Sequence, residues 1–457
     1  METDNSRSGV TEQPNTEHST IPNRWDHLRK ILERESPFDN SGYAPNKEVF
    51  EFVSNECRVL VVGAGGLGCE LLKDLCLMGF RHIDVIDMDT IELSNLNRQF
   101  LFRTSDIGKP KATVAAEFVN KRVLGAKVCG HHARIQDFSS EFYRQFNVVV
   151  CGLDSVLARR WINAMLVSLL DYDSETGNLI ESSVIPLVDG GTEGLKGNVR
   201  VILPGMSACL ECQLDLYPPP LNYPLCTVAQ TPRLPEHCVE WVKVLLWPRE
   251  WPFGNQVPID GDDPQHIQWC YGRALERCQQ YGIGPLTYRL TQGVIKRIIP
   301  AVASTNACIA AACANEVFKL ATSCASVMNN YMVLNLSSSI YTYTFELERK
   351  NDCLVCSRQQ RTLSVPADAT LRDVVELLCA DDGPYQMKAP AITTCDPVSD
   401  KHRTLYMKSV ASLEEATRVN LRKTLAHDLD LSDGQQLHVV DVTHPSSLIF
   451  TLRYTSS

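Results

Sequence analysis

Residues 57–87 read CRVLVVGAGGLGCELLKDLCLMGFRHIDVID. A short apolar run from Cys57 to Val62 precedes a glycine-rich turn, and apolar residues at helical spacing follow the turn. A second apolar run, from His82 to Ile86, ends at the acid Asp87. This order predicts a strand, a tight turn, a helix closed by Gly79 and a second strand, which together form the first unit of a parallel sheet.

The glycine turn holds Gly63, Gly65 and Gly68 at the spacing GxGxxG. Glycines let the backbone approach a phosphate, and the N-terminus of the following helix favours negative charge. Asp87 stands where an acid binds a ribose hydroxyl in dinucleotide-binding folds. Taken alone, the motif suggests an NAD-binding oxidoreductase, and a tight turn without a ligand is the alternative.

Further strand–helix units follow along the chain. A helix is expected to open near Pro110, a strand to cover Phe146 to Cys151, and an amphipathic helix to run through Trp161 to Leu170. Such repeats predict an α/β fold: a doubly wound, Rossmann-like, mostly parallel sheet with helices on both faces. Asp154 would then lie at the carboxyl end of a strand, where it either caps a helix or holds magnesium beside phosphates.

Composition narrows the class of protein. The chain has 457 residues, which predicts roughly two to four domains. Its formal charge of −10 argues against a general nucleic-acid binder. No apolar run is long enough to span a bilayer, and the polar N-terminus does not resemble a signal peptide. The 18 cysteines therefore predict metal ligation or thiol chemistry in a reducing compartment, the cytosol or the nucleus.

The sequence after Asp87 is not typical of a dehydrogenase. Residues 87–100, DMDTIELSNLNRQF, are unusually polar for a crossover between strands. Lys111 follows in the first turn of the next helix, where the helix dipole disfavours a cation, so we expect an anion beside it. For Arg98 or Lys111 taken singly, an ordinary solvated surface is the alternative.

Two pairs of cysteines have the spacing of metal-binding knuckles, Cys209 with Cys212 and Cys353 with Cys356. Two such pairs make a tetrahedral sulfur site for zinc. They flank a Trp- and Pro-rich segment, Glu236 to Trp269, that reads as an inserted, largely helical domain. Four buried thiols without a metal are the alternative.

The glycine turn, residues 87–100, Lys111 and residues 151–155 (CGLDS) together resemble the ubiquitin-activating enzyme family and its bacterial relatives that adenylate sulfur-carrier proteins. The resemblance covers nearly the whole chain from about residue 24. It implies that the C-terminal glycine of a small modifier attacks the α-phosphate of ATP, so that pyrophosphate leaves and an acyl-adenylate remains. Such chemistry depends on positioning and on charge stabilisation by Arg, Lys and magnesium.

The resemblance implies a role for each matching residue. Asp87 would bind the ribose, and Asp154 would ligate magnesium. Three residues would contact phosphates: Asn95, Arg98 and Lys111. The expected ATP site is completed by the glycines and two polar residues: Gly63, Gly65, Gly68, Asp89 and Gln99. Arg98 and Asp154 also count as catalytic, and family members carry structural zinc on the two cysteine pairs.

Cys226 lies just after a proline-rich crossover, Leu216 to Pro224, at the position of the family's nucleophilic cysteine. A thiolate can take the acyl group from AMP and pass it on. If Cys226 begins a helix, the helix N-terminus would lower its pKa. Without the resemblance, a buried inert thiol is the default for any single cysteine, and Cys238 is the nearest competitor.

Within the family, residues 197–204, 232–238 and 259–264 resemble the neddylation branch. This implies a heterodimer with a similar, catalytically inactive regulatory subunit that can lend an arginine to the ATP site. Arg200 matches an arginine of that branch. It would repel an arginine near the tail of ubiquitin, where the neddylation modifier has alanine. A surface arginine on a strand is the alternative.

The resemblance also implies the division into domains. We expect a leader and helix (1–45), an adenylation domain in two parts (46–205 and 286–357), an inserted catalytic-cysteine domain (206–285), and a β-grasp ubiquitin-fold domain that docks a conjugating enzyme (362–457). The alternatives are a SUMO- or sulfur-carrier-activating enzyme, an oxidoreductase, and a non-catalytic scaffold. Arg98, Lys111 and the cysteine pairs speak against the oxidoreductase, and no long C-terminal tail of the SUMO type is expected.

Overall fold

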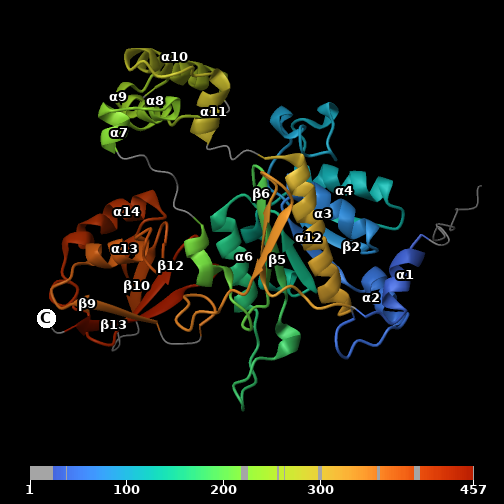
Figure 1. Cartoon of the computed structure of the whole chain (residues 1–457). Helices are drawn as coiled ribbons and strands as arrows, with labels where there is room; N and C mark the ends of the chain where they lie inside the picture. Colours follow the sequence, from blue (N-terminus) through green and yellow to red (C-terminus); the bar gives the residue numbers. More distant parts are fainter. Residues whose placement is uncertain are drawn as a thin grey trace, which may run out of the picture.

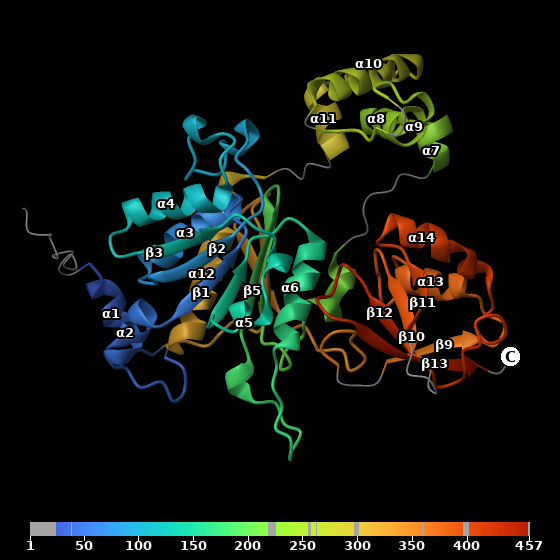
Figure 2. The ribbon, with the colours of Figure 1, turned by 180° about the vertical axis from the view of Figure 1, so that it is seen from behind.

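A computed structural model describes the chain in Figure 1 over the following residues: 24–37, 39–217, 225–254, 257–261, 263–296, 301–357, 361–395 and 402–455. It contains an eight-stranded sheet, a five-stranded sheet and a helical unit that stands apart from both in Figures 1 and 2. Within the described ranges, no helix combines the length and apolar character needed to cross a bilayer.

The eight-stranded sheet has the order β3-β2-β1-β4-β5-β6-β7-β8. Its strands are β1 (Arg58–Val62), β2 (His82–Ile86), β3 (Lys127–His131), β4 (Val148–Cys151), β5 (Leu187–Glu193), β6 (Lys196–Ile202), β7 (Tyr331–Asn335) and β8 (Tyr341–Phe345). The first five strands pair in parallel and the last three pair antiparallel. Because β1 lies between β2 and β4, the strand order reverses there, and ligands of open α/β sheets bind at the carboxyl ends beside such a reversal.

Helices cover both faces of this sheet, as the doubly wound prediction requires. On one face α3 (Gly66–Leu77), α4 (Lys111–Arg122) and α12 (Ala303–Thr322) share a core with the sheet, together with α2 (Glu48–Asn55) and the last residue of α1 (Asp26–Leu32). On the other face α6 (Val156–Ser168) and the one-turn α5 (Ser140–Tyr143) pack against it, as Figure 2 shows. The apolar strands β1, β2 and β4 are therefore buried from both sides.

The helical unit follows β6 in the sequence and has its own core. It comprises α7 (Leu225–Gln230), α8 (Pro235–Trp241), α9 (Trp247–Glu250), α10 (Pro264–Gln280) and α11 (Tyr288–Lys296). The core includes Cys238, Trp247 and Cys270, all fully or almost fully buried. Helix α11 packs against α8 and α10 through Leu290 and Val294, beyond the boundary at residue 285 that the sequence suggests. Among the described residues, the apolar face of α11 packs against this unit, and the next strand is β7.

The C-terminal unit is a five-stranded sheet of order β11-β10-β12-β13-β9. Its elements are β9 (Arg361–Pro366), α13 (Leu371–Cys379), β10 (Ala391–Cys395), β11 (His402–Met407), α14 (Ala411–Thr417), β12 (Gln436–Val440) and β13 (Leu448–Thr455). Thr370 and Asp373 form a reciprocal cap at the start of α13. Val374 and Leu378 of α13 pack on the sheet, as expected of a β-grasp unit.

Candidate functional site

The glycine turn lies between β1 and α3, beside the residues that follow β4. Gly63 has φ of +99°, and a Cβ there would lie 2.8 Å from the carbonyl oxygen of Gly152. A Cβ on Gly68 would lie 1.9 Å from the Gly63 carbonyl oxygen. Backbone packing therefore demands these two glycines. A Cβ on Gly65 would meet only the Gln99 amide nitrogen, at 3.9 Å, which leaves that side of the turn open to a ligand.

Asp87 follows β2 and holds the turn from the neighbouring strand. Its carboxylate accepts hydrogen bonds from the backbone N–H of Ala64 at 2.7 Å and of Asp89 at 2.8 Å. Burial raises the pKa of Asp87, while these hydrogen bonds and the nearby Lys111 oppose the rise. One acid thus connects the glycine turn to the chain that leaves β2.

Lys111 is the first residue of α4, and it is buried. Its Nζ lies 2.8 Å from a carboxylate oxygen of Asp89, so Asp89 supplies the anion that a cation at a helix N-terminus needs. The Asp89 side chain is 54% exposed, against 10% for Lys111. The pair therefore presents a buried cation next to Asp87, with its counter-ion on the solvent side.

Three more polar residues come from the stretch that follows β2. The Asn95 side-chain oxygen accepts a hydrogen bond from Glu92 N–H at 2.9 Å and caps a short turn of 3₁₀ helix, η1 (Leu93–Asn95). Arg98 donates to the Ser94 carbonyl at 3.1 Å and to the Asn97 side chain at 3.0 Å. The stem of Arg98 lies against Gly66: its Cγ would be 3.4 Å from a Cβ there. Arg98 therefore flanks the glycine turn, whereas the Asn95 side chain is held at η1.

Gln99 is 3% exposed, and its side-chain oxygen has no hydrogen-bond partner among the described residues. A buried acceptor without a donor is unfavourable, so a ligand that offers a hydroxyl or an amino group would stabilise this position. Gln99 also borders the open side of Gly65. The unpaired oxygen is therefore an observation that points to a ligand at the turn.

Asp154 lies exposed past the carboxyl end of β4. Ser155, not Asp154, caps α6: its hydroxyl accepts from Ala158 N–H at 3.4 Å. The loop is held by Arg159, which donates to the Leu153 carbonyl at 2.5 Å and pairs with Asp189 at 2.9 Å. Ser155 thus fills the helix-capping role that was the alternative for Asp154, and the Asp154 carboxylate lies on the solvent side of the loop.

Two residues that the sequence did not single out help to build the site. Arg159, just described, fixes the loop that carries Asp154. Asn306 of α12 packs on the turn, since its Nδ2 would be 2.3 Å from a Cβ on Gly66, and its Oδ1 accepts from the Thr192 hydroxyl at 2.7 Å. The sequence offered a signal for each. Asn306 is an amide in the otherwise small, largely apolar stretch NACIAAACA, and Arg159 is an arginine in a largely apolar helix.

The four paired cysteines meet at one buried point. The Sγ–Sγ distances are 3.8 Å for Cys209–Cys212, 3.6 Å for Cys209–Cys353 and 3.5 Å for Cys212–Cys356. A tetrahedron with metal–sulfur bonds of about 2.3 Å has edges of about 3.8 Å. All four sulfurs lie within 4.8 Å of one another. Hydrogen bonding to Cys209 lowers the pKa of Cys212 and of Cys356, the latter to about 7. The cluster can hold a metal ion such as zinc.

Cys226 is the second residue of α7, and its side chain lies outside the part of the structure that is described. Cys238, its competitor, is fully buried in the helical core, and burial raises its pKa to about 12. A thiol of this kind is a poor nucleophile at neutral pH.

Arg200 lies on β6 opposite Asp189 of β5 and is 3% exposed. Its guanidinium carbon lies 5.2 Å from the ring centroid of Tyr331 and 5.8 Å from that of Tyr217. Nε and Nη1 have no hydrogen-bond partner among the described residues. Arg200 is therefore not the solvated surface arginine of the alternative interpretation, and it retains unused donors.

Comparisons with known proteins agree with this architecture. The model of the ThiF family matches residues 53–355, and that of the E2 binding domain matches residues 364–454. A Drosophila melanogaster protein named Nedd8-activating enzyme E1 catalytic subunit is 59% identical over 436 residues, 95% of this chain and 96% of that protein. Its Dictyostelium discoideum namesake is 46% identical over 95% of this chain and 98% of that protein. A SUMO-activating enzyme subunit 2 from Dictyostelium discoideum is 43% identical over only 42% of this chain and 27% of that protein.

Proposed function

The chain belongs to the ThiF family and, within it, to the catalytic subunits of NEDD8-activating enzymes, and we propose that it activates a NEDD8-like modifier with ATP. A carboxylate oxygen of the modifier's C-terminal glycine attacks the α-phosphorus of ATP, and the bond to pyrophosphate breaks. The Cys226 thiolate then attacks the acyl carbon, and AMP leaves. The modifier finally passes to a conjugating enzyme.

The open glycine turn at the reversal of strand order carries the proposal. Gly65 is unobstructed, the buried Gln99 oxygen lacks a donor, and Lys111 brings a buried cation to the same edge of the sheet. ATP meets these needs because it offers ribose hydroxyls, an amino group and phosphates. Asp87 would accept from the ribose, while Asn95, Arg98 and Lys111 would face the phosphates, beside Asp89.

Asp154 is the residue that we assign to magnesium. Its exposed carboxylate follows β4 at the ligand-binding edge, and Ser155 relieves it of the capping role. When bound, magnesium supplies positive charge that offsets the phosphate oxygens. Arg159 supports this role indirectly, because its hydrogen bond to the Leu153 carbonyl fixes the loop that carries the Asp154 carboxylate.

Zinc is the metal that we propose for the four-cysteine cluster, since four thiolates at these distances match its tetrahedral preference. The pairs come from the two sides of the inserted helical unit. Zinc would therefore tie the chain entering that unit to the chain leaving it. Buried cysteines of the sheet and of the helical unit, such as Cys57, Cys151 and Cys270, form no disulfide, which suits a reducing compartment such as the cytosol or the nucleus.

Two protein partners follow from the proposal. The match to an E2 binding domain over residues 364–454 supports docking of a conjugating enzyme on the C-terminal unit. A regulatory subunit with an inactive adenylation domain would complete a heterodimer and lend an arginine to the ATP site. A SUMO modifier is the less favoured substrate, because the SUMO-activating relative resembles less than half of this chain. The proposal includes no nucleic acid and no membrane.

Arg200 is our candidate for choosing the modifier. Its Nε and Nη1 have no hydrogen-bond partner among the described residues, and Arg200 lies opposite Asp189 on the strand next to β7. An arginine near the tail of ubiquitin would be repelled there, whereas an alanine would not. We expect Arg200→Gln to admit ubiquitin; if ubiquitin is still rejected, another residue makes the choice.

Modifier-dependent exchange of labelled pyrophosphate into ATP tests the function, using the chain purified with its partner subunit. NEDD8 should support exchange, and SUMO and ubiquitin should not. Cys226→Ala should keep the exchange but form no reducible adduct with the modifier. Absence of exchange with every modifier would refute the proposed enzymatic activity. A reducible adduct on the Cys226→Ala variant would refute the assignment of Cys226 as the nucleophile.

A further inference from the structure

The helix that carries Cys226 is too short to hold itself in place. α7 runs from Leu225 to Gln230 and has only 6 residues. Isolated helices shorter than about 12–15 residues are marginal in water. The last carbonyl groups of any helix also lack partners within the helix. The orientation of α7, and with it the backbone of Cys226, must therefore be set by contacts with neighbouring helices.

Arg277 of α10 supplies such a contact. Its Nη2 donates to the carbonyl oxygen of Val228 at 3.0 Å and to that of Ala229 at 2.8 Å. Both carbonyls belong to the C-terminal half of α7, where a cation is favoured by the helix dipole. α10 is a firm support, because it spans 17 residues and buries Cys270 and Ala274 in the core of the helical unit.

The guanidinium group of Arg277 is itself held in one orientation. Its central carbon lies 4.1 Å from the ring centroid of Trp241 and 5.0 Å from that of Tyr281. The residue is 7% exposed, and its Nε has no hydrogen-bond partner among the described residues. A buried arginine with an unpaired donor is costly. Within the described chain, the hydrogen bonds of the guanidinium group go to α7 alone.

We propose that Arg277 is a positioning residue for the thioester step, holding α7 so that Cys226 can reach the adenylate. The inference rests on the proposed role of Cys226. Arg277 takes no part in adenylation, because the residues assigned to ATP belong to the eight-stranded sheet and its loops, while Arg277 is a buried residue of α10 in the helical unit. Its loss should therefore separate the two half-reactions.

The test compares both half-reactions in the complex with the partner subunit. Arg277→Met keeps much of the side-chain length but removes both hydrogen bonds to α7. Pyrophosphate exchange should stay within about twofold of wild type, while single-turnover thioester formation should slow about 10- to 100-fold, as misplacement of a reacting group does. Arg277→Lys keeps the charge and an ammonium group that can donate to α7 but loses the planar guanidinium, so its thioester rate should lie between those of wild type and Arg277→Met.

Arg273→Met is the matched control. Arg273 lies one turn earlier on α10, over the ring of Trp269, and pairs with Glu276 at 3.3 Å and Glu250 at 3.6 Å rather than with α7. Both half-reactions should be unchanged in this variant.

Equal losses of exchange and thioester formation in Arg277→Met would mean a general structural role and would overturn the inference, as would a wild-type thioester rate. If Arg277→Met does not fold, Arg277→Lys decides by the same comparison. Failure of the proposed function would look different. Wild type would then show no pyrophosphate exchange, or Cys226→Ala would keep its modifier adduct. An adduct on Cys226→Ala would also overturn the inference about Arg277.

Discussion

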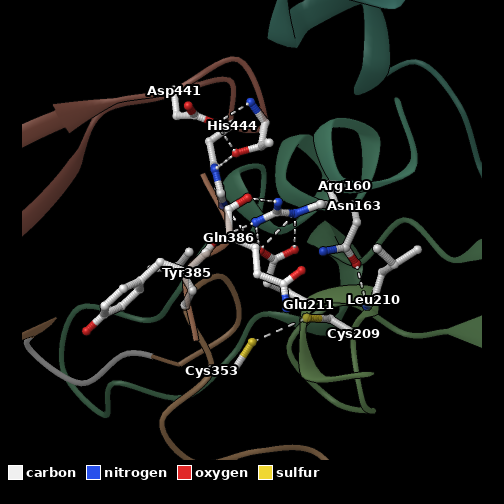
Figure 3. A network of polar contacts seen from close by, with 12 residues as sticks. Arg160, Asn163, Cys209, Leu210, Glu211, Cys353, Tyr385, Gln386, Asp441 and His444 are labelled. Atoms are coloured by element: carbon white, nitrogen blue, oxygen red, sulfur yellow. Dashed lines mark hydrogen bonds and ion pairs between the residues drawn. The ribbon is translucent and has the colours of Figure 1, made fainter. Parts of the chain in front are cut away.

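Arg160 and Glu211 form a buried ion pair that also joins two domains. The Arg160 Nε lies 3.1 and 3.0 Å from the two carboxylate oxygens of Glu211, and the side chains are 3% and 1% exposed. Arg160 also donates to the carbonyl oxygens of Tyr385 at 2.9 Å and Gln386 at 2.7 Å in the C-terminal unit (Figure 3). Glu211 stands between Cys209 and Cys212, so the joint adjoins the cysteine cluster.

Breaking this pair from one side should cost far more than replacing both partners. Arg160→Met leaves a buried, uncompensated carboxylate and should lower the free energy of unfolding by about 3–5 kcal/mol. The double variant Arg160→Met/Glu211→Met removes both charges and should recover part of that loss, although the carbonyls of Tyr385 and Gln386 stay unpaired. Denaturant titration of the three proteins checks this. A double variant less stable than the single would contradict the argument.

The same joint predicts a dependence on pH through His444. Burial, and then the charges of Arg160 and Arg361, lower its pKa to about 3, while Asp441 opposes them. In the unfolded chain histidine titrates near 6.5. Between these values the unfolded state binds a proton that the folded state refuses, so stability should fall as pH falls, by about 1.4 kcal/mol per unit.

His444→Gln should flatten this slope, because glutamine does not titrate. The comparison belongs between about pH 5 and 7, around the ordinary pKa of histidine. Glu211, whose pKa burial raises, contributes to the pH dependence in the opposite sense, but it does so in wild type and variant alike. The observable is the difference in unfolding free energy between wild type and variant at each pH. A constant difference across the range would show that His444 does not titrate as described.

Much of the fold followed from local sequence patterns. The order of β1, glycine turn, α3 and β2 could be predicted because the apolar residues of the strands and of the helix follow different spacings. The glycines between them mark the position of the tight turn. The paired spacing of the cysteines suggested a cluster, and folding brings the sulfurs together across a separation of 144 residues.

Other features depend on tertiary packing, which spacing does not reveal. The role of Arg159 arises only because β5 brings Asp189 beside α6, and that of Asn306 because α12 crosses the glycine turn. Arg277 is one of 44 lysine and arginine residues, and the sequence does not distinguish it from the others. Its hydrogen bonds to α7 arise only because α7 and α10 lie side by side in the fold. Likewise, the assignment of α11 to the helical unit depends on which unit covers its apolar face.

Metal content tests the cysteine cluster. Freshly purified protein should contain about one zinc ion per chain. Cys353→Ser should lose the ion and lower the unfolding midpoint, because the four ligands tie together segments on either side of the helical unit. Cys308→Ser, at an exposed position on α12, should change neither quantity. Zinc-free wild-type protein of full stability would contradict the assignment.

Lys111 and Lys109 offer a matched test of the ATP site, since they lie two residues apart and each pairs with an aspartate. Lys111 is buried with its Nζ 2.8 Å from Asp89, whereas the Lys109 side chain is 55% exposed and pairs with Asp106 at 2.9 Å. Lys111→Met should slow modifier-dependent pyrophosphate exchange about 100-fold or more, because a charge held in place for the phosphates is lost. Lys109→Met should change exchange little, because its charge is already screened by solvent. Equal effects of the two substitutions would mean that burial beside Asp89 gives Lys111 no special role, and the phosphates would then have to lie elsewhere along the sheet edge.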